Sequence, residues 1–322
     1  MILDYALTFF TALVVTLFVT PLVKRFAISR GAVDHPDERK IHASPIPRWG
    51  GLGIFLGICF GIGVSVLFSP AFRESAYEIH SREILAIIVS CLLMLGVGIV
   101  DDLKPVPAKL KLAIQLIAAF ILVASGVKVT FVSNPITHQV YYFKNYLGEI
   151  LTVIWIIGIT NALNLLDGLD GLLSGISTIS ALALFFTAIN KGYYFPAFIL
   201  LAMSGSTLAF LRYNFNPARI FLGDSGSLLI GMLWASLSIA GALKTETVTI
   251  FAPLLILGIP IADTLFAVLR RFGKGQSIFE PDKDHLHHRL LRLGWPQRKA
   301  VLVLYAIAGV LGILAYIIDR WY

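Results

Sequence analysis

The amino-acid sequence predicts an all-α polytopic membrane protein with about ten transmembrane helices, each needing about 20 mainly apolar residues. Of its 322 residues, 57% are hydrophobic and only 14% are charged, and the mean hydropathy is +0.82. A soluble domain carries about 25% charged residues. One water-soluble core cannot hide this much apolar surface, so the bilayer is the expected solvent. Cys59 and Cys91 lie inside apolar runs and give neither a disulfide framework nor a metal-ligand spacing.

Ten apolar runs account for this helix count. The first is followed by Lys24-Arg25 rather than by a small-residue cleavage site, so we interpret it as a span and not as a signal peptide. No internal repeat or low-complexity tract divides the chain, and residues 1–322 are expected to form one integral-membrane domain. The predicted spans are 3–23, 50–69, 83–100, 110–126, 147–163, 172–190, 194–211, 226–243, 248–269 and 299–318.

The distribution of Lys and Arg predicts the orientation, because cytoplasmic loops are enriched in both residues. The first, third, fifth, seventh and ninth connections hold nineteen of the 26 basic residues. These loops are therefore expected to be cytoplasmic, with both termini outside. The other basic residues are Arg73, Arg82, Lys128, Lys144, Lys191, Lys244 and Arg320.

An acidic pair, Asp101-Asp102, ends the third span in the segment Gly98-Ile-Val-Asp-Asp. Neighbouring residues point about 100° apart on a helix, so the two carboxylates can serve different partners. Two close acids split their pKa values unless a cation binds between them. The pair predicts metal association or proton abstraction; the alternative is a solvated helix end.

A second polar cluster follows the fifth span, where Asn164, Asp167 and Asp170 recur every three residues. On a helical turn this spacing places all three on one face. Gly168 and Gly171 allow a tight turn and a close approach of backbone to ligand. The cluster predicts substrate binding; the alternative is a capped helix start.

A third cluster runs from Asn214 to Ser227 and places Asp224 between two glycines at a helix N-terminus. Such a terminus offers backbone N–H groups to an anion, and a carboxylate beside it can hold a hard cation. The combination predicts a magnesium-bound phosphate. The alternative is that Asp224 is only a helix cap.

Two basic loops complete the pattern. His285, His287, His288 and Arg289 fall in the ninth connection, where they are expected to donate to a phosphate or a sugar. An amphipathic surface helix is the alternative, and zinc is a further one, although the surrounding oxygen ligands suit magnesium better. In the first connection Arg39, Lys40, His42 and Arg48 form a basic rim suited to an anionic lipid head group.

All of these clusters fall in odd-numbered connections, on one predicted face of the membrane. A single active site at that face explains this better than chance does. A lipid-linked-sugar or ion transporter is the competing class, but it favours paired broken helices near the bilayer midplane. Intramembrane ionisable groups cost about 2.5–3.5 kcal/mol each on insertion scales, so a purely structural scaffold does not account for them.

The order of the motifs resembles the polyprenyl-phosphate N-acetylhexosamine-1-phosphate transferase family, glycosyltransferase family 4. The resemblance runs from Arg39 to Leu293 and rests on four motifs: Asp-Asp, Asn-x-x-Asp-Gly-x-Asp-Gly, Asn-x-Asn-Pro-Ala-x-x-Phe-x-Gly-Asp-x-Gly and His-x-His-His. It implies that undecaprenyl phosphate attacks the β-phosphate of a UDP-N-acetylhexosamine, that UMP leaves, and that Mg²⁺ or Mn²⁺ is required. It also implies a multi-pass protein of the bacterial plasma membrane, with its site facing the cytoplasm.

The resemblance also implies roles for individual residues. Asp224 matches a metal-binding acid, and Asn164 lies where a second ligand or pyrophosphate contact is expected. Lys111 matches a pyrophosphate-binding lysine, and Asp170, with Asp167 nearby, a uridine-side contact. Asp101 is the candidate base for the lipid phosphate, supported by Asp102. The remaining substrate-binding candidates are Asn214, His285, His287, His288, Arg289, Lys40 and Arg48.

The sequence departs from some members of the family at Pro105, where they carry an acid or a lysine, so that residue's role does not transfer. The His-x-His-His form resembles the branch that uses UDP-GlcNAc, in the first membrane step of cell-wall, teichoic acid or O-antigen-type polysaccharide synthesis. UDP-GalNAc or UDP-MurNAc-pentapeptide is the alternative donor. The expected partners are both substrates and the bilayer, without nucleic acid, and a homodimer is allowed.

Overall fold

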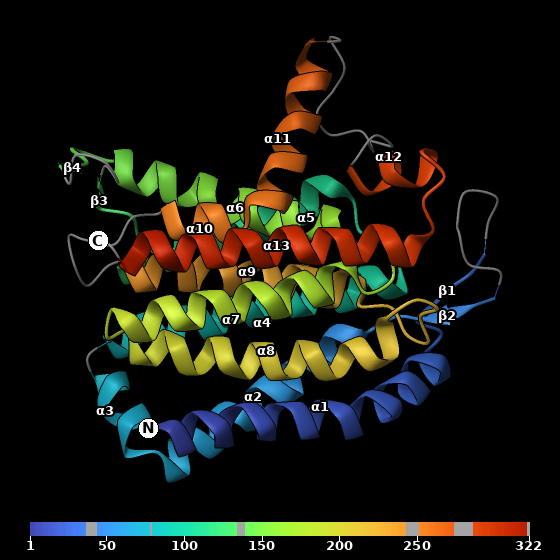
Figure 1. The fold of residues 1–322 in the computed structure, drawn as a ribbon, viewed down its shortest axis with the longest axis horizontal. Coiled ribbons are helices and arrows are strands. Elements are labelled where there is room, and N and C mark those ends of the chain that lie inside the picture. Colours follow the sequence, from blue (N-terminus) through green and yellow to red (C-terminus); the bar gives the residue numbers. More distant parts are fainter. Residues whose placement is uncertain (37–43, 78, 134–138, 243–250, 274–285, 321–322) are drawn as a thin grey trace.

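Long helices aligned with the longest dimension of the molecule make up most of the computed structural model (Figure 1). It describes residues 1–36, 44–77, 79–133, 139–242, 251–273 and 286–320. The helices are α1 (Ile2–Arg30), α2 (Gly50–Phe68), α3 (Pro70–Tyr77), α4 (Ser81–Leu103), α5 (Ala108–Ser125), α6 (Leu147–Leu166), α7 (Leu172–Asn190), α8 (Tyr194–Asn214), α9 (Gly223–Ala242), α10 (Phe251–Ile256), α11 (Gly258–Gly273), α12 (Leu286–Arg292) and α13 (Gln297–Arg320).

The predicted all-α membrane architecture is confirmed. Within the described residues, 8 helices are long and apolar enough to cross a membrane: α1, α2, α4, α5, α6, α7, α8 and α13. They correspond to the first seven predicted spans and the tenth. The eighth predicted span corresponds to α9, which has 20 residues.

The ninth predicted span, 248–269, is not one straight helix. Residues 243–250 lie outside the described part of the chain, and the remainder forms α10 and α11, which meet at Leu257. Pro260 has no backbone N–H, so the carbonyl of Ile256 loses its usual helical donor. The Ser180 hydroxyl of α7 donates to that carbonyl instead, at 3.4 Å. Beyond this point α11 turns away from the bundle axis (Figure 1).

Helix α9 lies at the centre of the bundle, packed against α4, α6 and α2. Residues 225–240 of this helix are all buried, as expected for a helix without a solvent face. Leu228, Ile230, Met232 and Trp234 are each at most 1% exposed. The first turn of α9, which carries Asp224, is therefore held between neighbouring helices.

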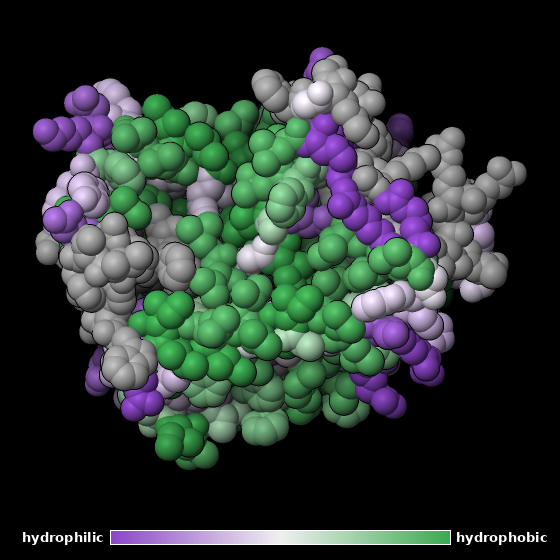
Figure 2. Space-filling view, turned by 45° about the horizontal axis from the view of Figure 1, so that its top comes forward, coloured by the Kyte–Doolittle hydropathy of each residue, from purple (hydrophilic) through white to green (hydrophobic). Residues whose placement is uncertain are grey.

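The surface separates into a broad apolar region and polar ends. Figure 2 shows hydrophobic side chains across the middle of the molecule and hydrophilic ones gathered towards the two ends of its long axis. This is the distribution expected of a bundle whose sides face hydrocarbon. The first residues of α1 and the last residues of α13 lie at the same end (Figure 1). The face on which the termini lie stays a prediction.

Two short antiparallel hairpins, which the sequence pattern did not predict, lie at opposite ends of the bundle (Figure 1). Strand β1 (Val33–Asp34) pairs with β2 (Ile46–Pro47), with Asp34 opposite Ile46. Strand β3 (Phe131–Ser133) pairs with β4 (Val140–Tyr142), with Phe131 opposite Tyr142. The first hairpin lies at the end of the bundle where the polar motifs converge.

Candidate active site

Asp224, in the first turn of α9, is the point on which three other helices converge. The Lys111 ammonium of α5 lies 2.9 Å from Asp224 Oδ2 and 3.2 Å from Asp101 Oδ1 of α4. Asn164, near the end of α6, donates from Nδ2 to Asp224 Oδ1 at 3.3 Å and to the Ser227 hydroxyl at 2.7 Å. Four residues predicted from separate motifs thus form one cluster.

Asp102 faces a different partner from its neighbour Asp101. Its side chain is fully buried, and its two oxygens accept the backbone N–H groups of Asp224 at 2.9 Å and Ser225 at 3.1 Å. These are among the N–H groups that a helix leaves without an internal partner, and a carboxylate there also complements the helix dipole. The two acids do serve two partners, as their spacing predicts. Asp102 thus binds the start of α9, and its expected support of a metal or of Lys111 stays a prediction.

Two glycines that sequence reasoning did not select bring α9 this close. A methyl carbon added to Gly98 of α4 would lie 2.5 Å from the backbone carbonyl of Asp224. One added to Gly51 of α2 would collide with the backbone of Gly226 and Ser225. Both glycines stand beside motifs that were noticed, Asp101-Asp102 and the first basic loop. The available signals were the position of Gly98 one turn before Asp101 and that of Gly51 directly after the first basic loop.

Arg48 reaches the cluster from the first hairpin. Its guanidinium forms an ion pair with Asp34 of β1, and its Nη1 lies 3.9 Å from Asp102 Oδ1. Next to it, Trp49 adopts a left-handed backbone conformation (φ 75°) and donates from its indole N–H to the carbonyl of Ile99 at 3.2 Å. The hairpin therefore fixes a cation beside the acidic cluster.

Asp167, directly after α6, is the acid with the most unusual surroundings. It is partly exposed, yet desolvation of its carboxyl group raises its pKa well above the ordinary value, and the carboxylates of Asp224, Asp102 and Asp170 raise it further. The Arg48 guanidinium opposes this shift. The raised pKa favours the protonated form of Asp167, and a cation nearby would favour the charged form.

Asp170 supports the loop after α8. Its Oδ2 accepts the Asn216 side-chain amide and the Ala218 backbone N–H, each at 3.0 Å. These contacts use one of its two oxygens. The expected uridine-side contact of Asp170 stays a prediction.

Asn214, the last residue of α8, joins the start of α7 to the loop that leads to α9. Its Oδ1 accepts the Gly171 N–H at 3.1 Å and the Ser174 hydroxyl at 2.9 Å, while its Nδ2 donates to the Ile220 carbonyl at 3.1 Å. Asn214 is only 2% exposed. These hydrogen bonds link the start of α7 to the loop before α9, and the expected contact of Asn214 with substrate stays a prediction.

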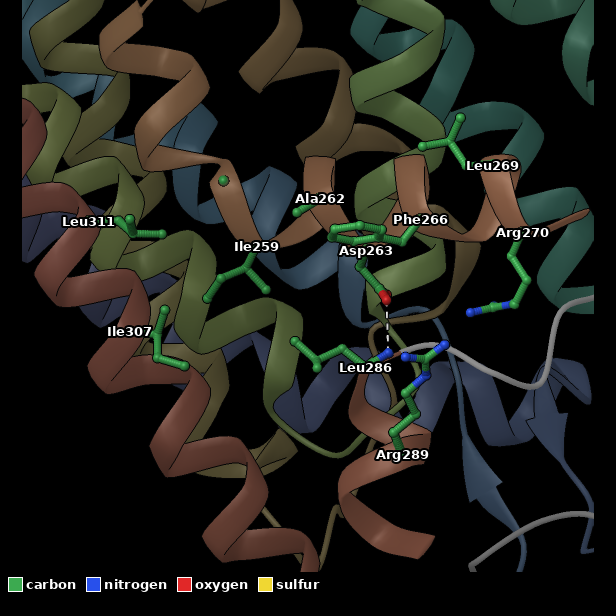
Figure 3. A pocket seen from close by; sticks show the side chains of 11 residues that line it. Ile259, Ala262, Asp263, Phe266, Leu269, Arg270, Leu286, Arg289, Ile307 and Leu311 are labelled. Atoms are coloured by element: carbon green, nitrogen blue, oxygen red, sulfur yellow. Dashed lines mark hydrogen bonds between the residues drawn. The ribbon is translucent and has the colours of Figure 1, made fainter. Parts of the chain in front are cut away.

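A cavity of about 640 Å³ opens between α11, α12 and α13 (Figure 3). Most of its lining is apolar, including Ile259, Phe266, Ile307 and Leu311. Asp263, Arg270 and Arg289 lie together towards one end (Figure 3), where Asp263 Oδ1 accepts the Leu286 N–H of α12 at 2.7 Å. An apolar cavity with charge at one end suits a ligand with a long apolar chain and an anionic group.

The side chains of three predicted histidines and one predicted lysine lie outside the described part of the structure. Lys40 and His285 lie outside the described residues. His287 and His288 belong to α12, but their side chains are outside the described part of the structure. Arg289 is exposed on α12 and lines the cavity. The expected contacts of the three histidines with the donor stay predictions.

The acidic cluster offers oxygen ligands of the kind that Mg²⁺ prefers. The carboxylates of Asp101 and Asp224 lie 3.2 Å and 2.9 Å from the same Lys111 ammonium, so the two acids are close together and a divalent cation could neutralise both. Among the described residues, no three acids, histidines or cysteines form a ready-made cage.

Comparison with known proteins identifies the family. The family model described as glycosyl transferase family 4 matches residues 84–242. A relative from Bacillus subtilis (strain 168), named probable undecaprenyl-phosphate N-acetylglucosaminyl 1-phosphate transferase, is 41% identical over 311 residues, covering 96% of this chain and 84% of the relative. The chain belongs to glycosyl transferase family 4. The family resemblance inferred from the four motifs is thereby confirmed.

Two further relatives are similar over almost the same length. A decaprenyl-phosphate N-acetylglucosaminephosphotransferase from Mycobacterium tuberculosis is 36% identical, covering 95% of this chain and 80% of the relative. An undecaprenyl-phosphate alpha-N-acetylglucosaminyl 1-phosphate transferase from Salmonella typhi is 30% identical, covering 92% and 78%. The stretch matched by the family model contains Asp101, Lys111, Asn164 and Asp224, whereas Arg48 and Arg289 lie outside it.

Proposed function

We propose that this chain transfers N-acetylglucosamine-1-phosphate from UDP-N-acetylglucosamine to undecaprenyl phosphate, releasing UMP and forming the lipid-diphosphate sugar. The observation that carries the proposal is the convergence of Lys111, Asp101 and Asn164 on Asp224 at the ends of membrane helices. Relatives covering more than nine-tenths of the chain are named for the same transfer to undecaprenyl or decaprenyl phosphate.

The reaction joins an oxygen of the lipid phosphate to the β-phosphorus of the donor and breaks the bond between that phosphorus and the oxygen of the departing UMP. Phosphoryl transfer depends mainly on positioning and on charge neutralisation. Lys111 supplies a cation between Asp101 and Asp224, where it can move to the pyrophosphate. Asp101 can accept a proton from the lipid phosphate, although a phosphate monoester is already largely ionised at neutral pH.

Magnesium fits the cluster as a cofactor. Asp224 would hold it, with Asn164 as a second oxygen ligand, and Mn²⁺ is the expected substitute. When bound, the ion neutralises charge on the donor pyrophosphate. Asp102 keeps its place on the backbone of α9, which fixes the carboxylate of Asp224 beside Lys111.

The two substrates are expected to arrive from different phases. We place the cluster on the cytoplasmic face of a bacterial plasma membrane, because the surrounding connections hold nineteen of the 26 basic residues. The nucleotide sugar would enter from the cytosol. The prenyl chain would enter from the bilayer through the apolar cavity of α11, α12 and α13, with Arg270 and Arg289 near its phosphate.

The test is UMP release by the purified protein with Mg²⁺, undecaprenyl phosphate and a panel of donors. Release with UDP-GlcNAc, and at lower rates with UDP-GalNAc or UDP-MurNAc-pentapeptide, is the expected result. A faster rate with one of the other two donors would change the assigned sugar. Flux of ions or lipid-linked sugar in proteoliposomes, without UMP formation from any donor, would favour the transporter class instead.

The cavity assignment predicts a selective effect of filling it. Ile307→Trp should raise the KM for undecaprenyl phosphate about tenfold, which corresponds to about 1.4 kcal/mol of lost binding free energy. The KM for the donor should change less than twofold. Ile313→Trp is the matched control, because Ile313 lies on the same helix and is 61% exposed but does not line the cavity. Equal effects of the two substitutions would rule out the cavity as the lipid site.

The raised pKa of Asp167 predicts that Mg²⁺ binding releases a proton. A carboxyl group with a raised pKa stays protonated where ordinary carboxylates are charged, and a cation stabilises the charged form. Mg²⁺ affinity should therefore increase as pH rises towards the pKa of Asp167 and level off above it. Calorimetry in buffers of different ionisation enthalpy measures the released proton. Asp167→Asn should reduce the release and Glu149→Gln should not, whereas an unchanged release in Asp167→Asn would contradict the assignment.

A further inference from the structure

Two amide side chains meet between α5 and α6, inside the bundle and apart from the charged cluster. Asn161 Nδ2 donates to Gln115 Oε1 at 2.7 Å, and Gln115 Nε2 donates back to Asn161 Oδ1 at 3.4 Å. Asn161 also donates to the carbonyl of Ile157 at 2.8 Å. Gln115 is only 2% exposed. The two residues thus form a reciprocal pair that ties one helix to the other.

The spacing places this pair directly beneath the site. Gln115 follows Lys111 by four residues on α5, and Asn161 precedes Asn164 by three on α6. Residues three or four apart share a helix face. At 1.5 Å per residue the pair lies about 4.5–6 Å deeper along the helices than Lys111 and Asn164.

The pair completes a triangle of interhelical contacts. Lys111 ties α5 to α9 through Asp224, and Asn164 ties α6 to α9 through the same carboxylate. Both contacts must change when a phosphate or a cation enters. The contact between Gln115 and Asn161 involves no charge and no proposed substrate ligand, so it can persist throughout turnover.

We propose that Gln115 and Asn161 are positioning residues, which fix the α5–α6 register so that Lys111 and Asn164 reach Asp224 together. The inference rests on the proposed function. Hydrogen bonds between membrane helices add little stability on average, so two leucines would hold the helices together almost as firmly. What the amides add is register, because a reciprocal pair forms at only one alignment of the two helices. A misplacement of about 1 Å at a reacting group can lower a rate about a hundredfold.

The kinetic test compares Gln115→Leu, Asn161→Leu, the double leucine variant and the exchanged pair Gln115→Asn/Asn161→Gln. Each single variant should lower kcat about 10- to 100-fold with donor KM within about threefold, and the double variant should fall no further, because contacting residues act as a unit. The exchanged pair keeps both amides and should recover most of the rate. Ser238→Ala is the control, since it removes the bond from Trp155 of α6 to α9, 2.9 Å long and away from the site.

Three results would each overturn the proposal. They are rates within twofold of the parent in both single variants, losses that multiply in the double variant, and an exchanged pair as slow as the leucine variants. A parent that releases no UMP would instead contradict the proposed function. A measurement that does not depend on activity then tests the pair. The distance between α5 and α6 is measured with spin labels at Lys109→Cys and Leu165→Cys, both exposed positions, in a Cys59→Ala/Cys91→Ala background. The label distance distribution should broaden or shift in Gln115→Leu and not in Ser238→Ala, and an unchanged distribution in Gln115→Leu would also overturn the proposal.

Discussion

Replacing Asp224 with asparagine is expected to lower UMP release about a thousandfold, the upper range for removing one preorganised electrostatic group. Asparagine has nearly the same shape but no charge. It would leave Lys111 with Asp101 as its remaining partner in this cluster and would weaken the hold on a divalent cation. The helix should still form, because the backbone N–H groups of residues 224 and 225 keep Asp102 as their acceptor.

The control for this variant is an acid in a comparable ion pair at the other end of the bundle. Asp319 of α13 lies 3.7 Å from Lys191, and its side chain is 3% exposed. Asp319→Asn should keep UMP release within twofold of the parent. The measurement is initial rate against Mg²⁺ concentration, with thermal unfolding recorded for both variants. A normal rate in Asp224→Asn would remove the acid from the catalytic machinery.

The sequence predicted that the site residues lie on the same face of the membrane, but it did not predict which of them are in contact. Lys111, Asn164 and Asp224 follow different apolar runs, and the distribution of Lys and Arg assigned all of them to one face. Helix ends on one face of a bundle are near one another whatever their order in the chain. The actual neighbours, such as Lys111 between Asp101 and Asp224, depend on which helices pack together. Hydropathy does not contain that information.

The contacts of Asp102 and Asn214 could not be predicted from the sequence for a related reason. The sequence motif is the same whether its carboxylate or amide faces a ligand or the backbone of another helix. Asp102 binds the start of α9, and Asn214 binds the start of α7. The break between α10 and α11 was not predicted because the residues on both sides of Pro260 are hydrophobic. The carbonyl of Ile256 accepts instead from Ser180 of α7, which is far away in the sequence.

Gly98→Ala is expected to reduce activity about a hundredfold, although it changes no polar group. The added methyl carbon would lie 2.5 Å from the backbone carbonyl of Asp224, so α9 must move away from α4. That movement lengthens both contacts from Asp102 to the first turn of α9 and shifts the carboxylate of Asp224 relative to Lys111. A displacement of about 1 Å at a catalytic group is enough for a loss of this size. Overpacking should also cost about 1–3 kcal/mol of stability.

Gly96→Ala tests whether the effect comes from this contact or from helix α4 itself. Gly96 lies two residues earlier on the same helix, and a methyl carbon added there meets nothing within 4 Å. It should leave UMP release unchanged and keep or slightly raise the unfolding temperature, since alanine is the better helix former by about 1 kcal/mol. If both variants retain full activity, α9 can be displaced without harm, and the placement of Asp224 by Gly98 and Asp102 is not what sets the rate. If only Gly98→Ala is slow while it stays folded, the close approach of α4 and α9 is required to bring the acid to Lys111.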